Sequence, residues 1–201
     1  TCLRFFGCAQ LLTLVLILPA SFAYADGKRL TSTQEAEWIY TARPGDSVKS
    51  IANKYLAQPE SWADLLRYNQ ISNINLLPPG TPVKIPLSLL RNYPKSATLV
   101  GRRGKVWFRK AQTTAYIPAL PGQKLKIGDE VKTQNGFAMI KFADGSQLRV
   151  ANHSIIIFNT LTHYGETGMV DTRFRLNKGK ISNKVKPRKG PASRYEVSTP
   201  S

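Results

Sequence analysis

The chain has 201 residues and is strongly basic, with 29 Lys and Arg against 12 Asp and Glu and a formal net charge of +17. Its length allows one or two domains. The only two cysteines, Cys2 and Cys8, lie in the leader-like segment described next. A chain without that segment therefore has no thiol for disulfides, thiolate metal sites or a cysteine nucleophile.

Residues 1–25 have the pattern of a cleavable signal peptide. Arg4 supplies a positive charge, an apolar run follows from Leu11 to Leu18, and Ala23-Tyr24-Ala25 provides the small residues that signal peptidase requires. The alternative is a retained membrane anchor, but the run is short for the roughly 30 Å of hydrocarbon in a bilayer. We therefore predict export to the periplasm or cell wall.

Export determines which binding partners are expected for the positive charge. In an exported protein the expected partners of a basic surface are anionic envelope polymers and phospholipid head groups, whereas nucleic acid is not expected. The basic residues form two groups, around Arg102-Arg103-Lys105 with Arg109-Lys110, and from Lys178 to Lys189. The simpler alternative is that both groups are solvated surface that keeps the protein soluble.

After a polar, flexible lead-in at residues 26–37, a first compact unit is predicted over residues 38–87. Trp38, Tyr40 and Ala42 alternate as in a strand, and Pro44-Gly45 turns the chain. A helix is expected next, capped by Asp46 or Ser47. Its buried face is predicted from helical spacing to consist of Val48, Ile51, Ala52 and Tyr55.

The second half of this unit contains another helix and a closing strand. Ser61 followed by Asp64 resembles a capping box, which predicts a helix start. Val83 and Ile85 alternate in a short run between Pro82 and Pro86, which suits a strand at the edge of a small sheet.

This unit resembles a LysM domain. The resemblance rests on an ordered set of motifs: Pro44-Gly45-Asp46-Ser47, Ser50-Ile51-Ala52, Leu65-Leu66-Arg67-Tyr68-Asn69 and Pro79-Gly80-Thr81-Pro82-Val83-Lys84-Ile85-Pro86. It implies an α+β module in the order βααβ and binding of peptidoglycan that contains N-acetylglucosamine. Val48-Lys49 departs from the usual pattern, in which a Leu precedes an aromatic or small residue.

The resemblance also implies where the glycan binds. The groove of the family lies between the first strand–helix loop and the second helix–strand loop. An exposed backbone at Gly45 with an apolar wall from Ile74 or Leu76 would suit an N-acetyl group. The predicted glycan-binding residues are Gly45, Asp46, Ser47, Val48, Ile71, Asn73, Ile74, Asn75, Leu76 and Leu77.

Residues 88–97 are predicted to be a linker in which Pro94 prevents regular structure. From residue 98 to 201 the pattern changes to short strands and turns, which predicts an all-β domain of short antiparallel strands, as a sandwich or a solenoid-like sheet. Asn135-Gly136 and Asp144-Gly145 are hairpin signals, and between them Ala138, Ile140 and Phe142 alternate with Met139 and Lys141.

This second unit resembles the FecR-type periplasmic domain. The matching residues are Leu125 to Thr133, Ala138 to Val150, Asn177-Lys178-Gly179-Lys180-Ile181 and Tyr195 to Pro200. The resemblance implies an envelope location and, in some members, a role in signalling, but not catalysis. A further strand usually follows the Thr-Pro, so we expect the domain to be truncated here.

Catalytic and metal-binding patterns are weak. His153 and His163 are the only histidines and have no acidic residue at a metal-ligand spacing, so we predict no metal, no cofactor and no enzyme activity. His153 is expected in a turn or at a half-buried position. Asp129-Glu130 is the one clustered acidic pair, and its position in a turn signal predicts a solvated role.

Three functions remain open. The first is a non-enzymatic envelope protein that binds peptidoglycan through its LysM-like unit and presents the β-domain to another envelope component, such as a second envelope protein. The second is a periplasmic signalling or sensor protein of FecR type. The third is the targeting region of a cell-wall hydrolase whose catalytic domain lies outside this sequence.

Overall fold

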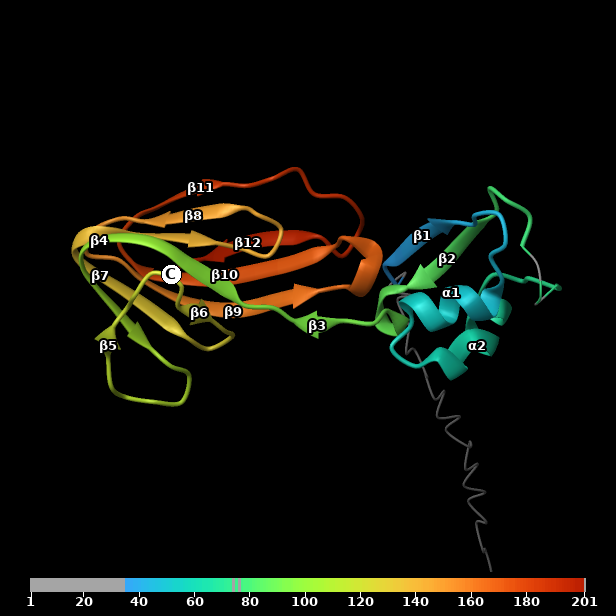
Figure 1. The fold of residues 1–201 in the computed structure, drawn as a ribbon, viewed down its shortest axis with the longest axis horizontal. Helices are drawn as coiled ribbons and strands as arrows, with labels where there is room; N and C mark the ends of the chain where they lie inside the picture. The colour runs from blue at the N-terminus through green and yellow to red at the C-terminus, as the bar shows by residue number, and fades with distance from the viewer. Residues whose placement is uncertain (1–34, 74, 76, 201) are drawn as a thin grey trace, which may run out of the picture. The chain divides into compact units, whose positions relative to one another are not determined.

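The computed structural model describes residues 35–73, 75 and 77–200 (Figure 1). The predicted signal peptide and most of the lead-in lie outside these residues. The described chain is mostly β, with 45% strand and 15% helix. It has a small region that carries the helices and a large, mainly antiparallel sheet.

The helical region begins and ends with paired strands. Strand β1 pairs antiparallel with β2, so that Trp38 lies opposite Ile85 and Tyr40 opposite Val83. The elements in chain order are β1 (Glu37–Thr41), α1 (Val48–Tyr55), the 3-10 turn η1 (Pro59–Ser61), α2 (Trp62–Tyr68) and β2 (Pro82–Pro86).

The two helices start in different ways. Helix α1 has the predicted cap, because the Ser50 amide donates to Ser47 Oγ over 3.1 Å and the Ser47 amide donates to Ser50 Oγ over 2.9 Å. The capping box predicted at Ser61 is wrong, since its side chain makes no cap hydrogen bond. Ser61 continues the 3-10 turn with φ −73° and ψ 12°, whereas an N-cap residue is typically extended.

The core of this region follows the predicted periodicity. Val48, Ile51, Ala52 and Tyr55 are all buried on one face of α1. They pack with Leu65 of α2 and with Val83 and Ile85 of β2, the last three fully buried.

The predicted linker has regular structure at the position where none was expected. Strand β3 (Tyr93–Pro94) pairs with β9, so that Pro94 lies opposite Thr162. Pro94 is tolerated here because a two-residue strand at the side of the sheet does not require its missing N–H. Just before it, Leu90 is buried and Arg91 Nε donates to the Leu56 carbonyl over 3.1 Å.

The large sheet has the strand order β11-β8-β7-β9-β10-β12, with β4 paired to β7, the short strands β5 and β6 paired to β4, and β3 paired to β9. Two strands are longer than predicted, because β4 has 13 residues and β7 has 12. The elements are η2 (Leu87–Leu89), β4 (Ala97–Arg109), β5 (Ile117–Pro118), β6 (Lys124–Leu125), β7 (Glu130–Lys141), β8 (Gln147–Val150), β9 (Ile155–His163), η3 (Gly165–Thr167), β10 (Val170–Lys178), β11 (Ile181–Lys184) and β12 (Arg194–Ser198).

One pairing is not antiparallel. Strand β12 runs parallel to β10, with Asp171 opposite Arg194. The segment after β11 crosses from one edge of the sheet to the other (Figure 1). The two edges approach each other, because Tyr195 of β12 donates to Asn183 of β11 over 2.9 Å. The sheet therefore curls around its core, where Phe142 packs against Phe158, Phe174 and Tyr195.

Of the two predicted hairpins, one is a turn and the other is not. Gly145 has φ +81° in the turn between β7 and β8, as predicted. Asn135-Gly136 lies inside β7, where these two residues face the single residue Gly104 of β4 in a bulge. A Cβ on Gly104 would stand 2.0 Å from the Asn135 carbonyl oxygen, so only glycine allows the strands to approach there.

Candidate functional site

The structure brings the two predicted glycan-binding loops together. The Leu77 amide of the second loop donates to the Asp46 carbonyl of the first over 3.0 Å. Asn73 Oδ1 accepts from the Asn75 amide over 3.0 Å and so shapes the second loop. Two of the predicted site residues, Ile74 and Leu76, lie outside the described residues.

The predicted residues differ in how accessible they are. Gly45, Asn73 and Asn75 are exposed, and Asp46, Ser47 and Ile71 are half-buried. Val48 and Leu77 are buried, with exposed fractions of 0% and 2%, and both belong to the core of the helical region. Their side chains therefore pack inside, and any ligand would meet their backbone or their neighbours.

Asp46 stabilises the first loop rather than capping the helix. Its Oδ2 accepts hydrogen bonds of 2.7 Å from the Tyr40 hydroxyl and from the Arg43 amide. The Tyr40 hydrogen bond is the main reason why the pKa of Asp46 is lowered. Burial, with help from the Asp46 carboxylate, raises the pKa of Tyr40 to about 12. The shape of the Gly45–Ser47 turn thus depends on a tyrosine that the sequence patterns did not connect to it.

Asn69 joins the end of α2 to strand β2. Its Nδ2 donates to the carbonyls of Leu65 and Lys84, each over 2.8 Å, and its Oδ1 accepts from the Lys84 amide over 2.7 Å. The side chain thus bonds β2 as a neighbouring strand would. The motif Leu65 to Asn69 pointed to this residue, but not to its partner.

The helical region also has two cavities whose lining does not include any of the predicted glycan-binding residues that the structure describes. One of about 560 Å³ is lined by the aromatic cluster of Trp38, Tyr40 and Tyr55 together with Glu166. Another, of about 240 Å³, lies between α1 and α2, where Lys49 Nζ stands 5.1 Å from the centre of the Trp62 ring. Neither was predicted, and the walls of the larger one come from residues that are distant in the sequence.

The solvated role predicted for Asp129-Glu130 is wrong. Asp129 is only 3% exposed and accepts from the amides of Ala111 and Lys126 over 2.9 Å and 2.8 Å. Glu130 is 4% exposed and is bonded to Arg109 and to the Tyr116 hydroxyl. Both carboxylates hold the segment between β4 and β7 in place. Apart from the Lys126 amide, their partners lie 14 to 21 residues away in the sequence, which is why local patterns missed them.

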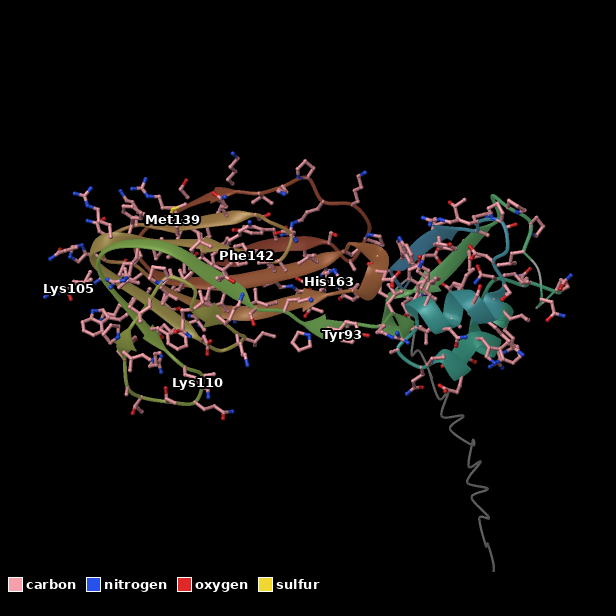
Figure 2. The ribbon with its side chains drawn as sticks, in the orientation of Figure 1. Tyr93, Lys105, Lys110, Met139, Phe142 and His163 are labelled. Carbon is pink, nitrogen blue, oxygen red and sulfur yellow. The ribbon has the colours of Figure 1, made fainter. Side chains whose placement is uncertain are left out.

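The two histidines lie apart and differ in environment. His153 is exposed in a turn with φ 52°, in line with the predicted turn. His163 is half-buried at the end of β9 (Figure 2), where burial and then the charge of Lys95 lower its pKa. Within residues 35–73, 75 and 77–200, no group of three or more His, Cys, Asp or Glu is placed to hold a metal ion.

The basic groups divide into structural and exposed members. Arg109 pairs with Glu130, and Arg188 pairs with Asp144 over 2.8 Å with both side chains 14% exposed. Arg102, Arg103 and Lys105 are exposed near the bulge, where Figure 2 labels Lys105.

Comparison with known families identifies two regions of the chain. The family model for the LysM domain matches residues 40–86, and the family model for the FecR protein matches residues 129–201. Both predicted resemblances are thereby confirmed over these residues, in the predicted order. LysM domains bind peptidoglycan- or chitin-type glycans. Both domain types are non-catalytic and typically extracytoplasmic.

A curated relative extends this comparison only slightly. A protein of Deinococcus radiodurans with the name "Uncharacterized protein" is 40% identical over 48 residues, which are 24% of this chain and 19% of the relative. The match thus spans about a fifth of that protein. No solved structure matches the chain. None of the helices in the described residues combines the length and the apolar character that a membrane span requires.

Proposed function

We propose that the protein is an exported, non-enzymatic envelope protein that binds peptidoglycan containing N-acetylglucosamine through residues 38–87. The FecR-like residues 98–201 would present a surface to another envelope component. The LysM match over residues 40–86 carries the glycan part of this proposal. The export part is supported by the signal-peptide pattern of residues 1–25 and by the typically extracytoplasmic location of both domain types.

The glycan site of this proposal is the junction of the two loops. The hydrogen bond from the Leu77 amide to the Asp46 carbonyl joins the loop that carries the exposed Gly45 to the loop that carries the exposed Asn73 and Asn75. Backbone groups at Gly45 and the two amides would bind the N-acetyl and hydroxyl groups of the sugar. A single shallow site of this kind is expected to bind weakly, with a Kd on the order of micromolar to millimolar.

Sedimentation with purified peptidoglycan tests this proposal. The mature protein should sediment at physiological salt and remain bound at about 1 M salt, where exposed charges are screened beyond about 3 Å. The double variant Asn73→Ala/Asn75→Ala should bind about thirtyfold more weakly, since each of the two lost neutral hydrogen bonds is worth about 1 kcal/mol and about 1.4 kcal/mol is a factor of ten in Kd. Asn152→Ala removes an exposed amide from the β-rich region and serves as the matched control.

Two outcomes would contradict the proposal. A protein that stays in the supernatant at physiological salt does not bind the glycan. Sedimentation that disappears at high salt, and that the double variant leaves unchanged, would show binding through charge instead.

A further inference from the structure

A cavity of about 380 Å³ lies at one end of the large sheet and is formed by four separate segments. These are the turn after β7, the end of β9, the start of β10 and the segment that leads into β12. Its polar lining includes Asp144, His163, Lys186, Arg188, Lys189 and Ser193. Its volume falls within the range of about 300–1,000 Å³ that is usual for small-molecule sites.

The single carboxylate of this cavity is already neutralised. Asp144 Oδ2 accepts from Arg188 and from the Ser146 hydroxyl, each over 2.8 Å, and Oδ1 accepts from the Ser146 amide over 2.8 Å. Arg188 NH1 also donates to the Val170 carbonyl over 2.6 Å. This network fixes the wall of the cavity.

The remaining charges of the lining are positive. Lys186 and Lys189 belong to none of the ion pairs in the described residues. Lys186 Nζ lies over the turn, 2.8 Å from where a Cβ of Gly145 would stand. Two ammonium groups without a counter-ion attract a divalent anion more strongly than a monovalent one, because the Coulomb energy grows with the charge.

A further hydrogen-bond donor lines the cavity. Burial and the positive charge of Lys95 lower the pKa of His163, and a neutral imidazole still has one N–H to donate. An oxyanion in the cavity could accept from this group.

We propose that this cavity binds a small phosphate monoester, with the phosphate between Lys186 and Lys189 and the ester group toward the apolar wall at Val170 and Pro187. Phosphate monoesters carry about −1.5 to −2 charges at pH 7. The cavity is larger than a bare phosphate, so it can also accommodate the alcohol part of the ester. This site is separate from the glycan loops and does not depend on glycan binding.

The two histidines provide a direct assay, because one lies in the cavity and the other on an exposed turn. Glycerol 3-phosphate is titrated into the mature protein with ¹³C-labelled histidine, at constant ionic strength and pH 7.5. The ring signals of His163 should shift and saturate, while those of His153 stay nearly unchanged. Glycerol alone, acetate and sulfate at matched ionic strength serve as ligand controls, and inorganic phosphate tests the contribution of the ester group.

Charge-matched variants test the role of the lysines. Lys186→Gln/Lys189→Gln should weaken binding at least tenfold, whereas Lys180→Gln/Lys184→Gln, which removes two exposed charges elsewhere, should change it less than twofold.

The proposal is overturned if His163 does not shift up to about 10 mM ligand, which is beyond useful small-molecule affinity. Equal shifts with acetate or sulfate, or equal loss of binding in both double variants, would show a general charge effect and would also overturn it. Binding of inorganic phosphate as tight as that of the ester would refute the role of the apolar wall.

Discussion

Replacing Tyr40 with Phe tests whether the first glycan loop depends on the hydroxyl of this residue. Tyr40 is 7% exposed, and its hydroxyl donates to Asp46 Oδ2 over 2.7 Å. The ring itself packs against Trp38 and Tyr55, with ring centres 5.7 Å and 5.1 Å away. Tyr40→Phe keeps the ring and removes only the hydrogen bond.

The expected loss of stability is about 1.5 kcal/mol. A hydrogen bond to a charged group contributes about 1.5–3 kcal/mol. Asp46 is half-buried, so water can replace part of the lost bond, and the Arg43 amide still donates to the same oxygen. Both facts place the effect at the lower end of that range.

The pH dependence of stability provides a second signature. The pKa of Tyr40 is raised to about 12 in the folded protein from 10.0. The unfolded chain therefore loses this proton first as the pH rises, and the free energy of unfolding should decrease between about pH 10 and pH 12. Tyr40→Phe should show a smaller decrease over this range than the wild type, because its remaining tyrosines are unchanged.

At low pH the free energy of unfolding depends on Asp46 and should decrease as the pH is lowered. The lowered pKa of Asp46 stabilises the folded protein above its unfolded value of 3.8, and this contribution is lost as the pH falls through the folded value. Tyr40→Phe removes the main cause of that lowered pKa, so its acid-induced loss of stability should be smaller than that of the wild type.

Urea unfolding between about pH 2 and pH 12, followed by circular dichroism, measures all three effects. A destabilisation below about 0.5 kcal/mol at pH 7, with unchanged slopes at both pH extremes, would refute the role assigned to Tyr40. Peptidoglycan sedimentation of the same variant then shows whether the loop must be held by Asp46 to bind glycan.

Three further variants test other parts of the fold by the same unfolding assay. Asn69→Ala should lower the free energy of unfolding by about 2 kcal/mol, since it removes three hydrogen bonds of about 1 kcal/mol each at a half-buried position. An effect under about 0.5 kcal/mol would show that water replaces all of them. Glu130→Gln should lower the free energy of unfolding by about 2 kcal/mol. This is less than the roughly 3–5 kcal/mol lost when a fully buried ion pair is broken, because 32% of the Arg109 side chain is exposed. An unchanged free energy of unfolding would mean that the pair contributes nothing. Gly104→Ala should cost about 4 kcal/mol or prevent folding, whereas Gly122→Ala, where a Cβ meets nothing within 4 Å, should cost only about 1–2 kcal/mol. Similar costs for the two glycine variants would contradict the close approach of β4 and β7.

Local periodicity predicted the helical region well. The buried face of α1 and the Ser47 cap depend on residues within one or two turns of each other, and the pairing of β1 with β2 follows from matched alternation at the two ends of the unit. The start of α2 was predicted at the right residue, but the capping box was not formed, because the preceding Pro59 begins a 3-10 turn that leaves Ser61 in the wrong conformation to cap.

Features of the large sheet depend on partners far along the chain. Asn135-Gly136 suits a hairpin and a bulge equally, and only its pairing with Gly104 selects the bulge. The cavity beside His163 illustrates the same limit, because its lining is drawn from four segments between residues 143 and 193. No single window of sequence contains enough of it to be recognised.

The helical region also shares its core with the β-rich region. Met169, 1% exposed, and Ala192 belong to the same buried cluster as Val48 and Ile51, and the described residues fall in one compact unit. A Cβ on Gly190 would meet Met169 Sδ at 2.5 Å and Trp38 Cδ1 at 3.9 Å. Residues 88–97 therefore connect two regions that support each other.

Met169→Ala tests this dependence, and Met139→Ala is the matched control because Met139 is half-buried on β7 (Figure 2). Removing a buried methionine side chain costs about 2–5 kcal/mol. In a Trp107→Phe background, tryptophan fluorescence reports only on Trp38 and Trp62 of the helical region. Met169→Ala should therefore lower the urea midpoint of that fluorescence, although the substituted residue lies in the FecR-matched segment. If the midpoint stays at its wild-type value while circular dichroism shows the sheet destabilised, the two regions unfold independently and the shared core is refuted.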